Sequence, residues 1–216
     1  MTEHGNPIRI MLVDDHAVVR AGYRFLLESI DDMAVVAEAT CGEEALEQVR
    51  SVNPDIMVID LAMPGMGGIE AIRQMRTVSP ATRLLVFTMH ENAAFVEHVL
   101  QIGIDGYISK NSSPETLVAA LRQVAAGEVY IDARVAQTLV IHQTRSAGSR
   151  FMPLSSREFQ ILCLFVEAYS VESIAGELSL TPKTVSNYLT QIKDKLQVNN
   201  TQELMRLAIS EGLVTV

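Results

Sequence analysis

The sequence contains only two cysteines and no long apolar run. These scarcities argue against a disulfide-stabilised protein and a membrane-spanning protein. No apolar segment approaches the roughly 18 residues that a membrane-spanning helix needs, so we expect no membrane span. The first residues, MTEHGNPIRIMLVDD, lack the basic-then-apolar pattern of a secretory signal, which predicts a cytoplasmic protein. Cys41 and Cys163 are far apart in the chain, and we expect two reduced thiols rather than a disulfide.

An excess of positive charge is also missing. The chain has 17 Lys/Arg against 26 Asp/Glu, a net charge of −9, which argues against a surface that coats nucleic acid uniformly. Residues 1–149 hold 11 basic and 19 acidic side chains, whereas residues 150–216 hold 6 and 7. The length of 216 residues and this uneven charge predict two modules with different partners.

Apolar residues make up 48% of the chain, and in the first module they alternate between two periods. Short apolar runs bounded by polar or turn residues predict five buried strands, at Ile8–Val13, Val35–Ala37, Ile56–Ile59, Leu84–Phe87 and Tyr107–Ile108. Stretches with helical spacing follow each run. Five such strands alternating with five helices predict an α/β fold, a doubly wound five-stranded parallel sheet.

The alternation of strand and helix patterns ends near Gly127. Ala133–His142 has the pattern of a short helix, and small, polar and basic residues lead from there to Pro153, so residues 128–152 are predicted to be a linker. Beyond it only helical patterns occur. The predicted domains are therefore residues 1–127, a linker over 128–152, and a small all-α domain over 153–216.

The last domain has the pattern of a helix-turn-helix. A short turn, Ser179–Thr181, separates two apolar helical stripes, and the second stripe is formed by Val185, Leu189, Ile192 and Leu196. Ser155 and Thr181 are placed as helix N-caps, and Pro182 follows at a first helical position.

Ionisable and hydroxyl side chains follow four of the predicted strands. They are Asp14 and Asp15, Asp60, Thr88, and the pair Ser109 and Lys110. The carboxyl ends of parallel strands meet at one edge of a sheet, where ligands bind in such folds, so we expect these groups to converge. Each also has an ordinary structural explanation, as a helix cap, a strand end or a solvated charge.

Three clustered carboxylates raise one another's pKa unless a cation neutralises them. Mg²⁺ suits this edge because it binds a few carboxylates and keeps water and phosphate oxygens as its other ligands. The pattern therefore predicts Asp60 as a nucleophile that forms an aspartyl phosphate. Mg²⁺, Thr88 and Lys110 are predicted to hold the phosphoryl oxygens, because phosphoryl transfer depends on positioning and charge neutralisation.

These residues carry a family resemblance. The segments IMLVDDHAVVRAGYRFLL, PDIMVIDLAMPGMGGIEAIRQM, LLVFTMHE and GIDGYISK resemble the receiver domain of two-component response regulators, which has a flavodoxin-like fold. LSSREFQILCLF and IAGELSLTPKTVSNYLTQIKDKL resemble the LuxR-type helix-turn-helix. In this order the motifs are similar to a NarL/FixJ-type response regulator over nearly the whole chain.

The resemblance implies a role for each matching position. A sensor histidine kinase would donate the phosphoryl group, and the receiver would catalyse only its own phosphoryl transfer and dephosphorylation, so the chain is not expected to be an enzyme in the usual sense. The implied positions are Asp60 as phospho-acceptor, Asp15 as a direct and Asp14 as a water-mediated Mg²⁺ ligand, the backbone carbonyl of Ala62 as a further ligand, Thr88 and Lys110 as phosphate-binding groups, and Thr88 with Tyr107 as the switch pair.

A few positions depart from the family pattern or invite another reading. Met89 is larger than the residue often found there and is expected to restrict access to the phosphate. Ala62 and His90 occupy positions that tune dephosphorylation in the family. His16 adjoins the acidic pair, and a structural role is favoured over metal ligation because a helix is predicted to begin there.

The predicted recognition helix presents Ser186, Asn187 and Thr190 on its exposed face, which match base-reading positions in relatives. Lys183, Lys193 and Lys195 are candidate contacts to DNA phosphates, although such a face also serves protein contacts. With so few cations, one domain should bind double-stranded DNA weakly, and a homodimer on a near-palindromic site would restore affinity. The expected dimer contact is formed by apolar residues of the last helix, which could instead be core: Leu204, Leu207, Ala208 and Leu213.

The sequence thus predicts a cytoplasmic, DNA-binding response regulator in which phosphorylation of Asp60 controls dimerisation or domain release, and hence transcription. One alternative is a Mg²⁺-dependent phosphatase-type enzyme with an aspartate nucleophile. That chemistry needs a second acid two residues after Asp60, where the chain has Ala62. Another alternative keeps the receiver and makes the C-terminal module a protein-interaction domain.

Overall fold

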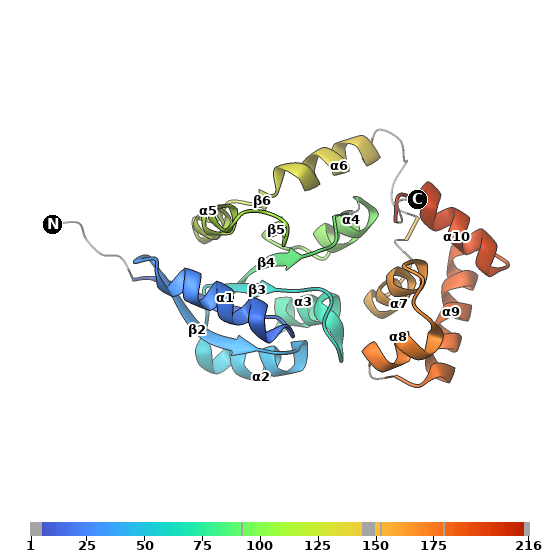
Figure 1. The fold of residues 1–216 in the computed structure, drawn as a ribbon, viewed down its shortest axis with the longest axis horizontal. Helices are drawn as coiled ribbons and strands as arrows, with labels where there is room; N and C mark the ends of the chain where they lie inside the picture. The colour runs from blue at the N-terminus through green and yellow to red at the C-terminus, as the bar shows by residue number, and fades with distance from the viewer. Residues whose placement is uncertain (1–5, 92, 144–149, 152, 179, 214–216) are drawn as a thin grey trace. The chain divides into compact units, whose positions relative to one another are not determined.

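The computed structural model of the chain describes residues 6–91, 93–143, 150–151, 153–178 and 180–213. They form two compact units (Figure 1). One unit runs to Met89 and resumes over Gly103–Asp132, and the other comprises His90–Ile102 and the chain from Ala133 onward. Among the described residues, no helix has the length and apolar character needed to cross a membrane.

The first unit is built on a parallel sheet, which confirms the predicted α/β class. The strand order is β2-β1-β3-β4-β5-β6, and every neighbouring pair is parallel. The strands are β1 (Ile8–Val13), β2 (Met33–Ala39), β3 (Ile56–Ile59), β4 (Arg83–Thr88), β5 (Gly106–Ser109) and β6 (Tyr130–Ile131).

The predicted count of five strands was one too low. The sixth strand, β6, has two residues and lies in the segment predicted as linker. Its backbone adds to the sheet edge, where Tyr130 N donates to Asp105 O at 3.0 Å and Asp132 N donates to Tyr107 O at 2.9 Å. Two residues are too few to show an alternating pattern, so only pairing in space defines this strand.

Helices cover both faces of the sheet, namely α1 (Ala17–Glu28), α2 (Gly42–Val52), α3 (Gly67–Val78) and α5 (Pro114–Ala125). Successive strand residues point to opposite faces. Ile10 and Leu12 of β1 therefore share one core with Leu27 of α1 and Leu121 of α5. Burial on both faces explains why all four residues of β3 are buried and apolar.

The second unit is helical, with α4 (Ala93–Gln101), α6 (Ala133–Gln143), α7 (Ser156–Val166), α8 (Val171–Glu177), α9 (Pro182–Leu196) and α10 (Thr201–Ser210). Helix α6 confirms the helix expected after Gly127. Phe159 of α7 is fully buried within this unit, with its ring centroid 5.4 Å from that of Phe95 and 4.2 Å from that of His98. Contacts thus group α4 with the C-terminal helices. The domain boundaries 1–127, 128–152 and 153–216 stay predictions. Residues 144–149 of the predicted linker lie outside the described chain.

The helix-turn-helix elements begin where the sequence predicts. Ser155 caps α7, with its hydroxyl accepting from Glu158 N, and Thr181 caps α9, with its hydroxyl accepting from Thr184 N. The predicted core residues of α9 are all buried, which leaves one face of the helix for other contacts. Leu204, Leu207, Ala208 and Leu213, which were predicted as a contact face or core, are buried within the chain and are therefore core, whereas Ile209 of α10 is 44% exposed.

Candidate functional site

The sheet brings the predicted strand-end groups to one edge. Val13 at the end of β1 pairs in register with Ile59 at the end of β3. The next residues continue this alignment, since Asp60 N donates to Val13 O at 2.9 Å. Further along the same edge, where β4 and β5 end, Lys110 N donates to Thr88 O at 2.8 Å. The parallel register therefore brings the ends of these strands, and with them the expected side chains, to the same edge of the sheet.

Lys110 joins the two buried carboxylates of this edge. Its Nζ lies 2.6 Å from Asp14 Oδ2 and 2.6 Å from Asp60 Oδ2. Asp14 and Asp60 are only 6% and 4% exposed. Burial by itself lowers the pKa of Lys110, but the charges and hydrogen bonds of Asp60 and Asp14 outweigh it and raise that pKa above its ordinary value. The ammonium is therefore fully charged at neutral pH.

Backbone amides hold the second oxygen of each carboxylate. Asp60 Oδ1 accepts from Leu61 N at 2.6 Å and from Ala62 N at 3.3 Å. Asp14 Oδ1 accepts from His16 N at 2.8 Å. Each side chain is thus fixed through one oxygen and presents the other to Lys110, which holds both carboxylates in one orientation.

The acidic cluster fits a divalent cation. Asp14, Asp15, His16 and Asp60 each offer a ligand atom, and these atoms lie within 4.8 Å of one another. Asp15 Oδ1 is buried and accepts no hydrogen bond from the described residues, although His16 Nδ1 lies 2.9 Å away. A buried carboxylate oxygen without a hydrogen bond is costly unless a cation completes its surroundings. Oxygen donors of this kind suit Mg²⁺.

His16 has the structural position expected for it, as the N-cap residue of α1. Its side chain is 62% exposed and its Nδ1 also lies 3.3 Å from Asp14 Oδ1. The histidine therefore borders the cluster from the solvent side, and the carboxylates form its buried part.

The two predicted switch residues are both fully buried: Thr88 and Tyr107 are each 0% exposed. Met89 is 60% exposed instead. Together with Lys110 and Pro114 it lines a groove of about 450 Å³ beside α1. Met89 therefore borders the same groove as Lys110, and its predicted effect on access to the phosphate stays a prediction.

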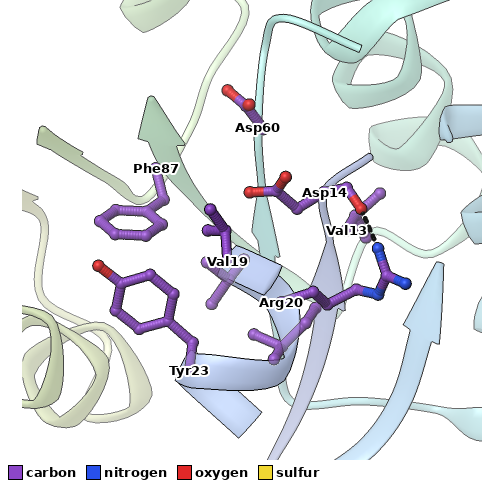
Figure 2. A pocket seen from close by; sticks show the side chains of 9 residues that line it. Val13, Asp14, Val19, Arg20, Tyr23, Asp60 and Phe87 are labelled. Atoms are coloured by element: carbon purple, nitrogen blue, oxygen red, sulfur yellow. Dashed lines mark hydrogen bonds between the residues drawn. The ribbon is translucent and has the colours of Figure 1, made fainter. Parts of the chain in front are cut away.

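A second pocket lies beneath the carboxylates (Figure 2). Its volume of about 10 Å³ has room for one water molecule at most, so it is too small for a phosphoryl group. Arg20 lines this pocket and holds the backbone of Asp14 in place. Its Nη1 donates to Asp14 O at 2.6 Å, and its Nε donates to Glu38 Oε2 at 2.9 Å. No sequence pattern singles out Arg20, because it is one basic residue within a helical pattern.

The exposed face of α9 matches the sequence prediction. Ser186, Asn187 and Thr190 are exposed, Lys183 is exposed and Lys193 is half-buried. Two hydroxyls are bound to the helix itself, since Ser186 Oγ donates to Pro182 O at 3.0 Å and Thr190 Oγ1 donates to Ser186 O at 3.1 Å. The face therefore offers hydroxyl acceptors, one amide and cations to a ligand.

Lys195 differs from the other two lysines of this helix. Its Nζ lies 2.6 Å from Glu158 Oε2, a carboxylate with a 3% exposed side chain. The same oxygen accepts from Ser155 N at 2.7 Å, which completes the N-cap of α7. Burial alone raises the pKa of Glu158, but the ion pair and these hydrogen bonds outweigh it and lower the pKa. Sequence spacing did not single out Glu158, because its partner is 37 residues away.

Comparison with known proteins supports both halves of this arrangement. Residues 10–122 match the response regulator receiver domain, and residues 152–208 match the bacterial regulatory proteins of the luxR family. The response regulator GacA of Pseudomonas aeruginosa is 38% identical over 209 residues, which cover 96% of this chain and 98% of GacA.

Solved structures of full-length relatives have the same architecture. RcsB from Salmonella enterica serovar Typhimurium, bound to promoter rprA in the presence of phosphomimetic BeF3⁻, is 28% identical with a TM-score of 0.67, covering 94% of this chain and 98% of that one. A structure of two RcsB dimers on two parallel DNAs is 28% identical with a TM-score of 0.62, covering 95% and 99%. The chain belongs to the two-component response regulators that join a receiver domain to a luxR-type DNA-binding domain and regulate transcription.

Proposed function

We propose that a sensor histidine kinase phosphorylates this response regulator on Asp60. The observation that carries the proposal is the position of Lys110, whose ammonium lies 2.6 Å from both Asp14 and Asp60. It offsets part of the negative charge of two carboxylates that would otherwise repel an incoming phosphoryl group. One oxygen of Asp60 is already held by backbone amides, so the carboxylate is oriented before the donor arrives.

In the proposed transfer, an oxygen of Asp60 attacks phosphorus as the bond between phosphorus and the donor histidine nitrogen breaks. Asp14, Asp15, Asp60 and the backbone carbonyl of Ala62 would hold Mg²⁺, which supplies positive charge to the phosphoryl oxygens. Lys110 and the hydroxyl of Thr88 bind the remaining oxygens. Because Thr88 is buried, its movement toward the phosphate opens space that Tyr107 can fill, and this carries the signal to the surface.

The effector half of the proposal is DNA binding by α9. Lys183 and Lys193 contact phosphates, and Ser186, Asn187 and Thr190 read base edges. Lys195 is left out because it is paired with Glu158. The DNA-bound and dimeric states of RcsB support a phosphorylation-controlled homodimer on DNA. A regulator that binds the bacterial chromosome works in the cytoplasm.

The phosphatase-type alternative is not favoured. Such an enzyme needs an acid two residues after its nucleophile to protonate the leaving group, and this chain has Ala62 there. We therefore propose that catalysis is limited to the chain's own phosphorylation and dephosphorylation. Turnover of a phosphomonoester by the protein would overturn this part.

Acetyl phosphate labelling tests the phospho-acceptor. With Mg²⁺ present, the wild-type chain should carry one hydroxylamine-labile phosphoryl group, and Asp60→Asn should carry none. Asp55→Asn is the matched control, since Asp55 is an aspartate at the opposite end of the same strand. An unlabelled wild type, or undiminished labelling of Asp60→Asn, contradicts the mechanism.

Footprinting tests the effector half. The phosphorylated chain should protect a near-palindromic site in its own promoter region or elsewhere in the genome, and Asn187→Ala should abolish that protection while leaving phosphorylation unchanged. Absence of protection by the phosphorylated protein would favour a protein-interaction role for the C-terminal domain.

A further inference from the structure

The carboxylate of Glu43, which the proposed chemistry does not use, lies against the loop that follows Asp60. Glu43 is in the first turn of α2, and its Oε1 accepts from Met66 N at 2.8 Å. A Cβ atom at Gly65 would lie only 2.6 Å from the same oxygen. Gly65 also has a φ of +76°, so glycine is required there both for backbone conformation and for this approach.

Glu43 acts as a cap for a helix other than its own. Met66 is the N-cap residue of α3, and its own side chain forms no cap hydrogen bond. The N–H groups at a helix N-terminus need acceptors, and a negative charge is favourable there. The neighbouring Gly42 makes this possible, because a Cβ on it would lie 2.7 Å from Ala71 Cβ of α3.

The first turn of α3 is in turn in contact with the backbone of the proposed phospho-acceptor. A Cβ atom at Gly68 would overlap the carbonyl oxygen of Asp60. Gly68 N donates to Leu61 O at 3.2 Å. The N-terminus of α3 and the peptide of Asp60 therefore cannot shift independently, and the loop between them contains the proposed metal-binding carbonyl of Ala62.

Glu43 is also an expensive way to build this contact. Its Oε2 is buried and has no hydrogen-bond partner among the residues that the structure describes. A buried carboxylate oxygen without a partner lowers stability. The contact with Met66 N is therefore kept at a cost to stability, which is the pattern of a contact retained for its function.

We propose that Glu43 is a positioning residue for phosphoryl transfer. It fixes residues 61–66 through Met66 N, so that Asp60 and the carbonyl of Ala62 face one metal ion and one phosphorus atom. The inference rests on the proposed function of Asp60. Outer groups that orient metal ligands typically affect metal affinity or activity by about 10- to 100-fold, and we expect the lower end because Glu43 acts through the backbone.

The test measures phosphorylation by acetyl phosphate as a function of Mg²⁺ concentration. Glu43→Ala should be phosphorylated about 10-fold more slowly and need more Mg²⁺ for half-maximal rate. Glu43→Gln should stay within about 2-fold of wild type, because its amide oxygen accepts the same hydrogen bond. Glu47→Ala is the matched control, since Glu47 is exposed on the same helix one turn later, and its rate should not change.

A second readout needs neither metal nor phosphate. In Mg²⁺-free protein the amide hydrogen of Met66 should exchange faster in Glu43→Ala than in wild type, Glu43→Gln or Glu47→Ala. If Glu43→Ala does not fold, Glu43→Asp shortens the side chain by one methylene group and should give a smaller loss in the same direction.

The inference is overturned if Glu43→Ala is phosphorylated at the wild-type rate with the wild-type Mg²⁺ requirement. The same holds for Glu43→Asp where that variant replaces Glu43→Ala. Equal losses in Glu43→Gln and Glu43→Ala also overturn it, because the hydrogen bond would then be irrelevant. Labelling of wild type but not of Asp60→Asn is measured alongside. If that pattern is missing, the proposed function itself fails, which is a different result from a normal rate in Glu43→Ala.

Discussion

The edge of the parallel sheet and the exposed face of α9 hold their charges in opposite ways. At the sheet edge, the buried carboxylates of Asp14 and Asp60 share the ammonium of Lys110, whose side chain is 10% exposed, at 2.6 Å. On α9, Lys183 is solvent-exposed, and no ion pair of Lys183 is found among the described residues. A buried cluster has one geometry and suits chemistry that depends on position, whereas a solvated face can adapt to a long flexible partner.

The largest effect should come from removing the central cation of the sheet edge. Lys110→Met leaves two buried carboxylates without their partner and removes a ligand of the phosphoryl oxygens, so phosphorylation by acetyl phosphate should slow by about 100-fold or more. Lys183→Met, on the solvated face, should leave this rate unchanged. A loss of only a few-fold in Lys110→Met would remove the distinction between the two regions.

The second unit extends the comparison because it contains a buried ionisable side chain, His98, whose burial favours the uncharged form. His98 is 7% exposed, its Nδ1 has no hydrogen-bond partner in the described chain, and burial lowers its pKa to about 4. The unfolded chain binds this proton below about pH 6.5 and the folded chain does not. The contribution of neutral His98 to the free energy of unfolding is therefore fully present above pH 6.5. It is lost as the pH falls toward 4, by about 3 kcal/mol in total.

Hydrogen exchange of the slowest α7 amides, followed from pH 7 to pH 4, measures this stability. His98→Phe keeps a ring against Phe159 and removes the titration, so its stability should fall less over the same range. Parallel pH curves for the two proteins would show that His98 does not carry the dependence.

A smaller effect separates the lysines of α9 from each other. Lys195→Met leaves Glu158 buried without its cation, and breaking a buried pair costs several kcal/mol; because Lys195 is 42% exposed, we expect about 2 kcal/mol of unfolding free energy. DNA affinity of the folded protein should change little. A large loss of DNA affinity with unchanged stability would return Lys195 to the binding face.

The smallest effect is expected on the solvated face itself. Lys183→Met should weaken DNA binding by a few-fold on every sequence and reduce the slope of log affinity against log salt by about one. Titrations at several salt concentrations measure this slope, with Lys195→Met as the control that keeps it. Loss restricted to particular sequences would mean that Lys183 reads a base.

Much of this arrangement could be predicted from the sequence, because short strands and helices differ in period. The buried stripe Val185, Leu189, Ile192 and Leu196 placed the exposed face of α9 on the correct side. The two-residue strand β6 escaped prediction because it has no period of its own. The residues of α10 were ambiguous because a dimer face and a core show the same apolar spacing.

The sequence by itself determined which groups end the strands, since a polar residue after an apolar run must lie at the end of a buried strand. Only the tertiary structure decided how those groups pair. Lys110 reaches Asp14 across 96 residues, Met66 reaches Glu43 across 23 and Lys195 reaches Glu158 across 37. No local pattern encodes such distances, because each contact depends on the packing of separate elements into one core.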